Sequence, residues 1–355
     1  MQIKLKSFLF FMAAIFVLPL LSETKLKIHT EKVLELGKRD LLFNSIASVY
    51  EDNQQNFYVL DRTAFRVYKF SPDGSLLLDF GNKGQGPGEF QAPHDIYVLE
   101  NGNIAVSEDM TFVSIFDAQG HFIKRISTQR GLALTYLNEN LFYAWLWDNE
   151  GRRQHLVDRD GTLLKTFFSV SREAFSVSAP DESGRRVMFN YASSEIAPSL
   201  IFNRFKSHMV VAVGDRYEFP LLNTKGQQVS IIKRDVKPQK LSSRERDYLL
   251  NRIQETRKWP PWVMKLIRKN MPKVKALFDS IRISENFVFV FRIRANITDK
   301  NGPYPVDIFR FNGEYTGTAH LEIKPLLISG RFMYAAGFDE KNDLILSKIR
   351  YFITH

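Results

Sequence analysis

A phrase that recurs five times is the feature that most limits how this chain can fold. Each copy is an apolar strand of alternating polarity, a short polar turn that ends in glycine, and a second apolar strand; the glycines are Gly74, Gly120, Gly161, Gly226 and Gly313. Glycine supplies the positive φ that a tight hairpin needs, and period-2 alternation gives each strand one buried face. The first three glycines are 46 and 41 residues apart, which is too long for a solenoid coil and fits a four-stranded propeller blade.

The rest of each unit supplies the other strands of a blade. Apolar runs precede the phrases at 57–61, 103–107 and 141–145, and the runs at 45–50 and 94–98 have the pattern of innermost strands. The sequence therefore predicts an all-β fold, a six-bladed β-propeller. The expected blades are 38–81, 90–128, 131–170, 171–235, 277–323 and 326–355. Seven blades remain an alternative if the strand-like run 186–191 belongs to a degenerate unit.

The two ends of the repeat region complement each other. The strand-like segment 27–36 has no unit of its own, while the last unit lacks a terminal glycine turn and an outer strand. Pairing the first strand with the last blade satisfies both exposed edges and closes the ring. We therefore expect the sixth blade to contain strands from both ends of the chain.

The segment before the propeller has the pattern of a signal peptide at 1–22, with the propeller at 26–355. Lys4 and Lys6 precede an apolar stretch at 8–21, which is shorter than the roughly 20 residues of a membrane-spanning helix. Export to the periplasm or the extracellular space follows. Leu20 is bulky where a small residue is preferred before cleavage, so an uncleaved membrane anchor stays open. The chain has no Cys, which excludes disulfides, thiolate chemistry and lipid-modified cysteine.

The positive charge of the chain is concentrated in one segment. Residues 233–275 contain 14 Lys and Arg against four Asp and Glu, a net charge of +10 that equals the net charge of the whole chain. Ser242 and Glu245 form the pattern of a capping box, and Trp259-Pro-Pro-Trp262 separates two helical runs. We expect a helical hairpin at about 240–275, inserted between two blades.

This insert is a candidate docking element. Trp259 and Trp262 lie among the cations Lys258, Lys265, Arg268, Lys269, Lys273 and Lys275. Aromatic rings beside cations suit an anionic membrane surface or an anionic partner, whereas nucleic acid is disfavoured by the predicted export. In the alternative interpretation, the apolar side of the hairpin packs on the propeller rim and the cations are only solvated.

The connection Phe80-Gly-Asn-Lys-Gly-Gln-Gly-Pro-Gly-Glu-Phe-Gln-Ala-Pro-His-Asp-Ile96 resembles the blade junction of NHL-repeat propellers, a group that includes bacterial exported six-bladed proteins. In that group a glycine-rich turn leads into the innermost strand of the next blade. The resemblance implies a central channel whose face binds ligands. Enzymatic relatives hold zinc with channel histidines, as in peptidyl-amidoglycolate lyase, or calcium with Glu, Asn and Asp, as in the lactonases.

The channel-face candidates are His94, Asp95, Glu108 and Asp109. Pro93-His94 matches the lyase pattern, but the strand starts near Asn44 and Leu132 carry no further histidine, and a zinc site needs about three ligands. Oxygen ligands for calcium are present, although Asp and Asn at strand ends are typical turn formers. We therefore expect no metal, no cofactor and no catalytic residue. The expected function is binding of a small ligand or protein on the channel face, and the alternative is a metal-dependent lyase or hydrolase.

Overall fold

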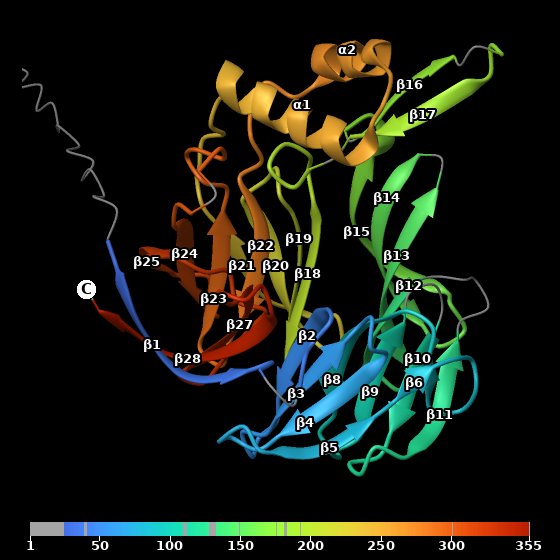
Figure 1. Cartoon of the computed structure of the whole chain (residues 1–355), viewed down its shortest axis with the longest axis vertical. Coiled ribbons are helices and arrows are strands. Elements are labelled where there is room, and N and C mark those ends of the chain that lie inside the picture. Colours follow the sequence, from blue (N-terminus) through green and yellow to red (C-terminus); the bar gives the residue numbers. More distant parts are fainter. Residues whose placement is uncertain are drawn as a thin grey trace, which may run out of the picture.

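The chain folds into six four-stranded antiparallel sheets arranged in a ring, with two helices at one edge of the ring (Figure 1). The computed structural model describes residues 25–38, 41–108, 112–127, 133–148, 150–174, 176–180, 183–191, 193–299 and 301–354. The predicted signal peptide and Asp109 lie outside these residues. The prediction of a six-bladed β-propeller is confirmed.

The first three blades follow one another along the chain without interruption. In each, the strands lie in sequence order from the inside of the ring to the outside. Blade 1 consists of β2 (Ile46–Glu51), β3 (Phe57–Asp61), β4 (Arg66–Phe70) and β5 (Leu76–Phe80). Blade 2 consists of β8 (Pro93–Val98), β9 (Ile104–Glu108), β10 (Phe112–Phe116) and β11 (Phe122–Ser127). Blade 3 consists of β12 (Ala133–Asn138), β13 (Leu141–Asp148), β14 (Gly151–Asp158) and β15 (Leu163–Ser171).

The last three blades complete the ring. Blade 4 consists of β18 (Leu200–Phe205), β19 (His208–Val213), β20 (Glu218–Asn223) and β21 (Gln228–Lys233). Blade 5 consists of β22 (Phe278–Ile283), β23 (Phe287–Arg292), β24 (Tyr304–Arg310) and β25 (Tyr315–Leu321). Blade 6 consists of β26 (Leu327–Ser329), β27 (Phe332–Phe338), β28 (Leu344–Thr354) and β1 (Lys27–Leu36).

The five repeated glycines occupy equivalent positions in blades 1 to 5. Each lies in the hairpin between the third and the outermost strand, and each has a positive φ, from 76° at Gly226 to 93° at Gly74. Blade 6 has no such turn because its outermost strand comes from the other end of the chain. β1 pairs antiparallel with β28, from Lys27 opposite Thr354 to Leu36 opposite Leu346. The predicted closure is confirmed.

Two short sheets lie outside the blades. β6 (Asn82–Lys83) and β7 (Glu89–Phe90) form a parallel pair inside the glycine-rich connection. β16 (Ser176–Pro180) and β17 (Arg186–Asn190) form an isolated hairpin between blades 3 and 4, after the 3-10 turn η1 (Arg172–Ala174). The seven-blade alternative is therefore wrong. Among the described residues the strand-like run at 186–191 pairs with β16 and supplies no blade, and its hairpin lies beside the helices (Figure 1).

Aromatic rings fill the joints between neighbouring blades. Each such pair joins a ring of one blade to a ring of the next, with centroids 4.0 to 6.1 Å apart: Phe57–Tyr334, Phe80–Phe116, Tyr143–Phe202, Phe219–Phe278 and Phe289–Tyr351. Ring pairs at these distances stabilise the fold beyond the free energy gained by burying the rings themselves. Seven phenylalanines of these pairs thus pack one blade against the next.

The helices α1 (Ser243–Arg257) and α2 (Pro261–Asn270) lie between β21 and β22, that is, between blades 4 and 5. α1 begins with the predicted capping box, since Ser242 and Glu245 each accept from the other's backbone N–H. α2 begins at Pro261 without a side-chain cap. The predicted helical insert is confirmed.

Candidate functional site

One face of the ring carries the first residues of the inner strands, and the opposite face carries their last residues. Near the starts of β18 and β22, the Gly214 carbonyl accepts from the Leu277 N–H at 2.7 Å and the Gly214 N–H donates to Ser199 at 2.9 Å. Just past their ends, Lys206 pairs with Glu285 at 3.2 Å. Neighbouring inner strands therefore run in the same direction, and we call the two sides the start face and the end face. The helical insert precedes β22 directly and lies on the start face.

Asp95 lies at the centre of the ring between blades 1 and 2. Its carboxylate accepts from the Ser48 hydroxyl on β2 and from the Tyr97 hydroxyl on β8, both at 2.6 Å. His94, the preceding residue, is partly buried at the start of β8. Of the four predicted channel residues, Asp95 is thus the one whose contacts place it on the channel face.

Glu108 lies at the end of β9 and is almost completely buried. Its two carboxylate oxygens accept from the Ser114 hydroxyl at 3.0 Å and from the Gln91 N–H at 2.7 Å, and Arg125 lies 3.7 Å away. Arg125 in turn donates to the Gln85 carbonyl at 3.0 Å in the glycine-rich connection. In this structure Glu108 therefore holds the blade junction, while Asp109 lies outside the described residues.

No three His, Asp or Glu of the described residues come close enough together to hold a metal ion. His94 and Asp95 are consecutive, but Glu108 is engaged at the junction. The donor set that zinc or calcium requires is not assembled by these residues.

Arg204, the fifth residue of β18, reaches across the centre of the ring. Its guanidinium lies 5.0 Å from the centre of the Tyr97 ring on blade 2, and its Nη1 donates to the Tyr136 carbonyl on blade 3 at 2.5 Å. Its Nε donates to the Lys206 carbonyl at 3.3 Å. One side chain of blade 4 thus contacts its neighbour, blade 3, and also blade 2.

Arg282, the fifth residue of β22, lies beside Arg204. The Asn203 side chain accepts from the Ile283 N–H at 2.9 Å, which brings the two arginine-bearing strands into register. Arg282 donates from Nε to the Pro325 carbonyl and from Nη1 to the Ile281 carbonyl, both at 2.8 Å. All the oxygens that accept from these two guanidinium groups are neutral backbone carbonyls.

Burial determines how the ionisable groups behave here. It lowers the pKa of Arg204 and of Arg282, because removing a guanidinium from water disfavours its charged form; Asp95 acts in the opposite direction on both, and Asp279 does so more strongly on Arg282. Burial and the Asp95 charge raise the pKa of Tyr97 well above its ordinary value. Tyr97 therefore stays a neutral hydrogen-bond donor, and Asp95 is the carboxylate that acts on both arginines.

The sequence interpretation did not identify either arginine. The signal is a single arginine at the fifth position of two apolar inner strands, Leu200–Phe205 and Phe278–Ile283. A strand buried in a propeller centre carries such a cation only at a cost. Comparing equivalent positions of successive units would have marked both residues.

The helical insert has its own apolar core. Leu249 and Ile253 of α1 pack with Val263 and Ile267 of α2, and the cluster extends to Ile297 of blade 5. The insert is further attached by the paired contacts of Arg252 with Glu195, at 2.9 Å. The apolar side of the hairpin therefore faces the propeller, as one of the two interpretations of the sequence expected.

The predicted docking residues divide into two groups. Trp259 is partly buried and Trp262 is 46% exposed, and both rings contact Phe189 of β17 edge-on at 5.5 Å. The cations Lys265, Arg268, Lys269 and Lys273 are exposed. Arg268 pairs with Asp247 at 2.8 Å. The structure thus places exposed cations beside one half-exposed indole ring.

Part of the positive charge of this segment serves the fold. Lys275 is buried and pairs with Glu245 at 2.5 Å, so its inclusion in the predicted surface is wrong. Arg234 pairs with the buried Asp307 of blade 5 at 2.6 Å. A carboxylate partner stabilises a buried ammonium or guanidinium, and the spacing of charges along a sequence does not reveal where that partner lies.

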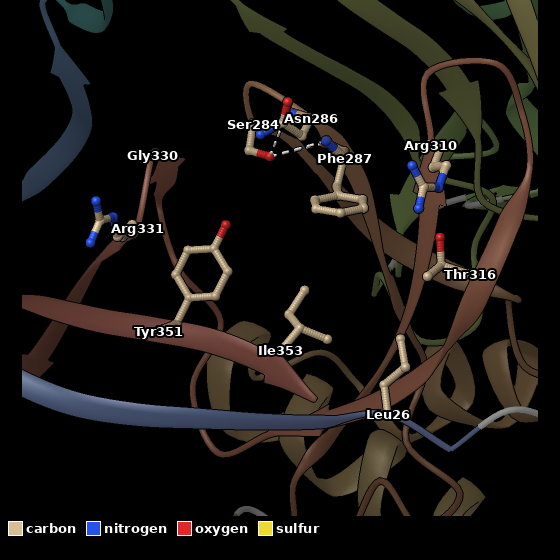
Figure 2. A pocket seen from close by; sticks show the side chains of 10 residues that line it. All are labelled: Leu26, Ser284, Asn286, Phe287, Arg310, Thr316, Gly330, Arg331, Tyr351 and Ile353. Atoms are coloured by element: carbon tan, nitrogen blue, oxygen red, sulfur yellow. Dashed lines mark hydrogen bonds between the residues drawn. The ribbon is translucent and has the colours of Figure 1, made fainter. Parts of the chain in front are cut away.

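A pocket of about 330 Å³ lies between blades 5 and 6 (Figure 2). The side chains that line it come from both blades and from the segment before β1: Leu26, Ser284, Asn286, Phe287, Arg310, Thr316, Gly330, Arg331, Tyr351 and Ile353. Tyr351 and Ile353 project into it from β28, facing Phe287 (Figure 2). This lining combines apolar side chains with two arginines and includes no Asp, Glu or His.

Comparison with known proteins supports the fold. A family model described as a 6-bladed beta-propeller (DUF5128) matches residues 33–184. No curated protein matches the chain in sequence. The chain is a six-bladed β-propeller, and the NHL-repeat resemblance is not confirmed by this match.

Two solved structures resemble the chain over most of its length. One is a protein from Bacteroides fragilis for which export has been inferred, with a TM-score of 0.53 and 12% identity over 92% of this chain and 95% of the other. The second is a member of the duf4221 family from Bacteroides vulgatus, with a TM-score of 0.51 and 12% identity over 93% and 99% of the two chains. At this identity the similarity establishes the fold alone.

Neither of the two helices in the described part of the chain has the length and apolar composition of a membrane span.

Proposed function

We propose that this protein is an exported, non-catalytic propeller of the NHL-like group that binds a ligand or a protein partner on its channel face. The observation that carries the proposal is the arrangement around Asp95, where the hydroxyls of Ser48 and Tyr97 hold a partly exposed carboxylate at the centre of the ring. Fixed polar groups on a channel face are suited to orienting a ligand. His94 and Asp109 are proposed to take part in the same channel site, and Glu108, whose oxygens are engaged at the blade junction, to support it.

Export is part of the same proposal. The segment 1–22 has the pattern of a signal peptide, and the fold is shared with a Bacteroides fragilis protein for which export has been inferred. Residues 26–355 then form the mature propeller, in the periplasm or outside the cell.

The helical insert is proposed as the docking element. Its apolar core packs on blade 5, which leaves Trp262 and the exposed cations Lys265, Arg268, Lys269 and Lys273 on the outer side. Such a surface suits anionic headgroups or an anionic partner. Because the insert lies on the start face, partner docking and ligand binding near His94 are proposed to take place on the same side of the ring.

The test is a melting-temperature screen against neutral, cationic and anionic small molecules, with a variant that obstructs the channel. Ser48→Trp places an indole beside Asp95, and the matched variant Ser75→Trp changes an exposed residue on the outside of blade 1. We expect at least one compound to raise the melting temperature of the wild type and of Ser75→Trp but not of Ser48→Trp. Equal effects on all three proteins, or none on the wild type, would contradict binding on the channel face.

A second candidate is a metal-dependent lyase or hydrolase of the same propeller group. The observation that favours it is Pro93-His94 at the start of an inner strand. Metal content separates it from the binding function, because the relatives that carry out catalysis depend on a channel ion.

A further inference from the structure

Arg204 and Arg282 form an unusual pair of cations at the centre of the ring. They occupy the same position in the inner strands of adjacent blades. Neither forms an ion pair with any carboxylate of the residues that the structure describes; their hydrogen bonds go to four backbone carbonyls. Like charges on neighbouring strands repel each other where burial removes part of their water, and neutral acceptors only partly replace that water.

Each guanidinium keeps one nitrogen for a further partner. Nε and Nη1 donate to carbonyls in both residues, while Nη2 of Arg204 and of Arg282 forms no hydrogen bond within the described structure. Neither of these two Nη2 atoms is fully buried. Both side chains are partly exposed, so solvent or a ligand reaches them.

The opening toward these arginines is on the end face. Both are the fifth of six strand residues, near the end of β18 and of β22. Lys206 and Glu285 lie just beyond and pair with each other at 3.2 Å, with side chains 37% and 30% exposed. A ligand of the arginines therefore enters from the end face. The helical insert and His94 lie on the opposite side, the start face.

The charges nearby indicate which anion fits. Asp95 acts on both arginines, and its own oxygens are held by Ser48 and Tyr97. Asp279 acts on Arg282 more strongly than Asp95 does, but its charge is balanced by Lys324 at 2.6 Å. The two guanidinium groups and Asp95 then leave a single positive charge to be balanced. A planar carboxylate matches a guanidinium edge in shape and carries one negative charge, whereas a dianion would also be repelled by Asp95.

We propose that Arg204 and Arg282 bind the carboxylate of a small organic monoanion that enters the channel from the end face. The rings of Tyr50 and Tyr97, with centroids 6.2 Å apart beside Arg204, form the adjoining aromatic wall for the organic part of the ligand. This site rests on the proposed binding function of the channel and assigns its ligand class.

The experiment uses benzoate as the probe and benzamide, its neutral isostere, as the control compound. Calorimetric titrations at constant ionic strength compare wild-type protein with Arg204→Gln, Arg282→Gln and the matched variant Arg216→Gln, whose side chain is 62% exposed. We expect wild type and Arg216→Gln to bind benzoate and not benzamide, and each central variant to bind benzoate at least tenfold more weakly. Inorganic phosphate should bind more weakly than benzoate.

Three results would overturn the site: no benzoate binding by the wild type, equal binding by all variants, or benzamide binding as well as benzoate. Tighter binding of phosphate would overturn the carboxylate assignment. Arg204→Lys and Arg282→Lys keep the charge and lose the planar fork, so they should bind benzoate with intermediate affinity and serve as folded references if a Gln variant unfolds. If the wild type binds no benzoate but binds a neutral ligand that Ser48→Trp blocks, the proposed function stands and this site is overturned.

Discussion

Glu245 connects the helical insert to blade 5 through a carboxylate that is almost completely buried. It accepts from the Ser242 N–H at 3.0 Å and the Ile297 N–H at 3.2 Å, and it pairs with Lys275. Burial by itself raises the pKa of Glu245, but the hydrogen bonds from Lys275 and Ser242 outweigh burial and hold the pKa at about 2. The ionised carboxylate is therefore much more stable in the folded protein than in the unfolded chain.

This shift predicts how stability depends on pH. A carboxyl whose pKa falls from 4.5 to about 2 on folding stabilises the protein above pH 4.5, and that contribution, about 3 kcal/mol, is lost as the pH falls toward 2. Glu245→Gln should lower the free energy of unfolding at pH 7 by a similar amount, because Lys275 stays buried without its carboxylate. Urea unfolding from pH 7 to 2 measures both. The control variant Asp247→Asn, which removes an exposed pair with Arg268, should lower the free energy of unfolding by less than about 1 kcal/mol. If the free energy of unfolding changes with pH in parallel for wild type and Glu245→Gln, the role of Glu245 is contradicted.

Gly81 opens the glycine-rich connection with a φ of 93°. A Cβ on this residue would meet the Phe90 ring and would lie 2.9 Å from the Phe65 carbonyl. Gly81→Ala therefore combines backbone strain with a clash against the completely buried Phe90 ring, and we expect a loss of about 2 kcal/mol or more in unfolding free energy. The matched variant Gly337→Ala, where an added Cβ meets nothing within 4 Å, should unfold at nearly the wild-type urea concentration. If the two variants are equally stable, the junction does not need glycine at 81.

At the scale of elements, β1 is the strand that joins the two ends of the chain. Besides its pairing with β28, the segment before it contacts blade 5, where the Leu26 N–H donates to the Thr318 carbonyl at 3.0 Å. Leu26 also lines the pocket between blades 5 and 6 (Figure 2). Closure therefore stabilises two blades rather than one.

Deleting residues 26–37 should lower the unfolding free energy by several kcal/mol, because the outer ladder of blade 6 and its apolar contacts are lost and β28 becomes an exposed edge. Thermal unfolding of this deletion is to be compared with a chain that begins at residue 25. An unchanged melting temperature of the deletion variant would mean that β1 contributes little to closure.

The helical insert makes a prediction about anionic membranes. Replacing Lys265, Arg268, Lys269 and Lys273 by Gln should leave the fold intact, since all four are exposed. It should weaken binding to vesicles of anionic lipid by up to about 1 kcal/mol per cation, less where Asp247 already pairs with Arg268, and the effect should diminish with salt. Vesicle sedimentation at low and high salt measures it.

The matched control removes the same charge from exposed positions on the blades. It replaces four lysines by Gln: Lys83, Lys165, Lys225 and Lys341. The control should sediment with vesicles as the wild type does. Equal binding by the wild type and both variants, or binding by none of them, would mean that the cations of the insert are only solvated.

At the scale of the whole molecule, the ring assembles few metal ligands at its centre. Purified protein should contain much less than one zinc or calcium ion per chain, because no three described His, Asp or Glu converge on one point. Elemental analysis of the wild type and of His94→Ala tests this. Stoichiometric zinc that disappears in His94→Ala would replace the binding function by the lyase-like alternative.

Much of the architecture could be predicted because it depends on local patterns. The hairpin glycines, the alternating strands and the capping box each specify a conformation within a few residues, and a sixfold repetition makes the pattern hard to misread. The central site could not be predicted in the same way. Asp95 was identified from its position in one strand, but Arg204 and Arg282 become a pair only when blades 4 and 5 lie side by side.

The sequence by itself therefore determined the strand units, their order, the closing strand and the helical insert, with six blades favoured and seven left open. Hydrogen bonding within a hairpin and the burial of one strand face act between neighbours along the chain, which is why pattern alone was sufficient. Only the tertiary structure decided which charges are buried and which are available. Lys275 and Arg234 found carboxylates far away in sequence, in Glu245 and Asp307, while the two central arginines found only carbonyls. A charge is stabilised by whatever lies within a few ångströms of it, and in a ring those groups come from blades tens of residues apart.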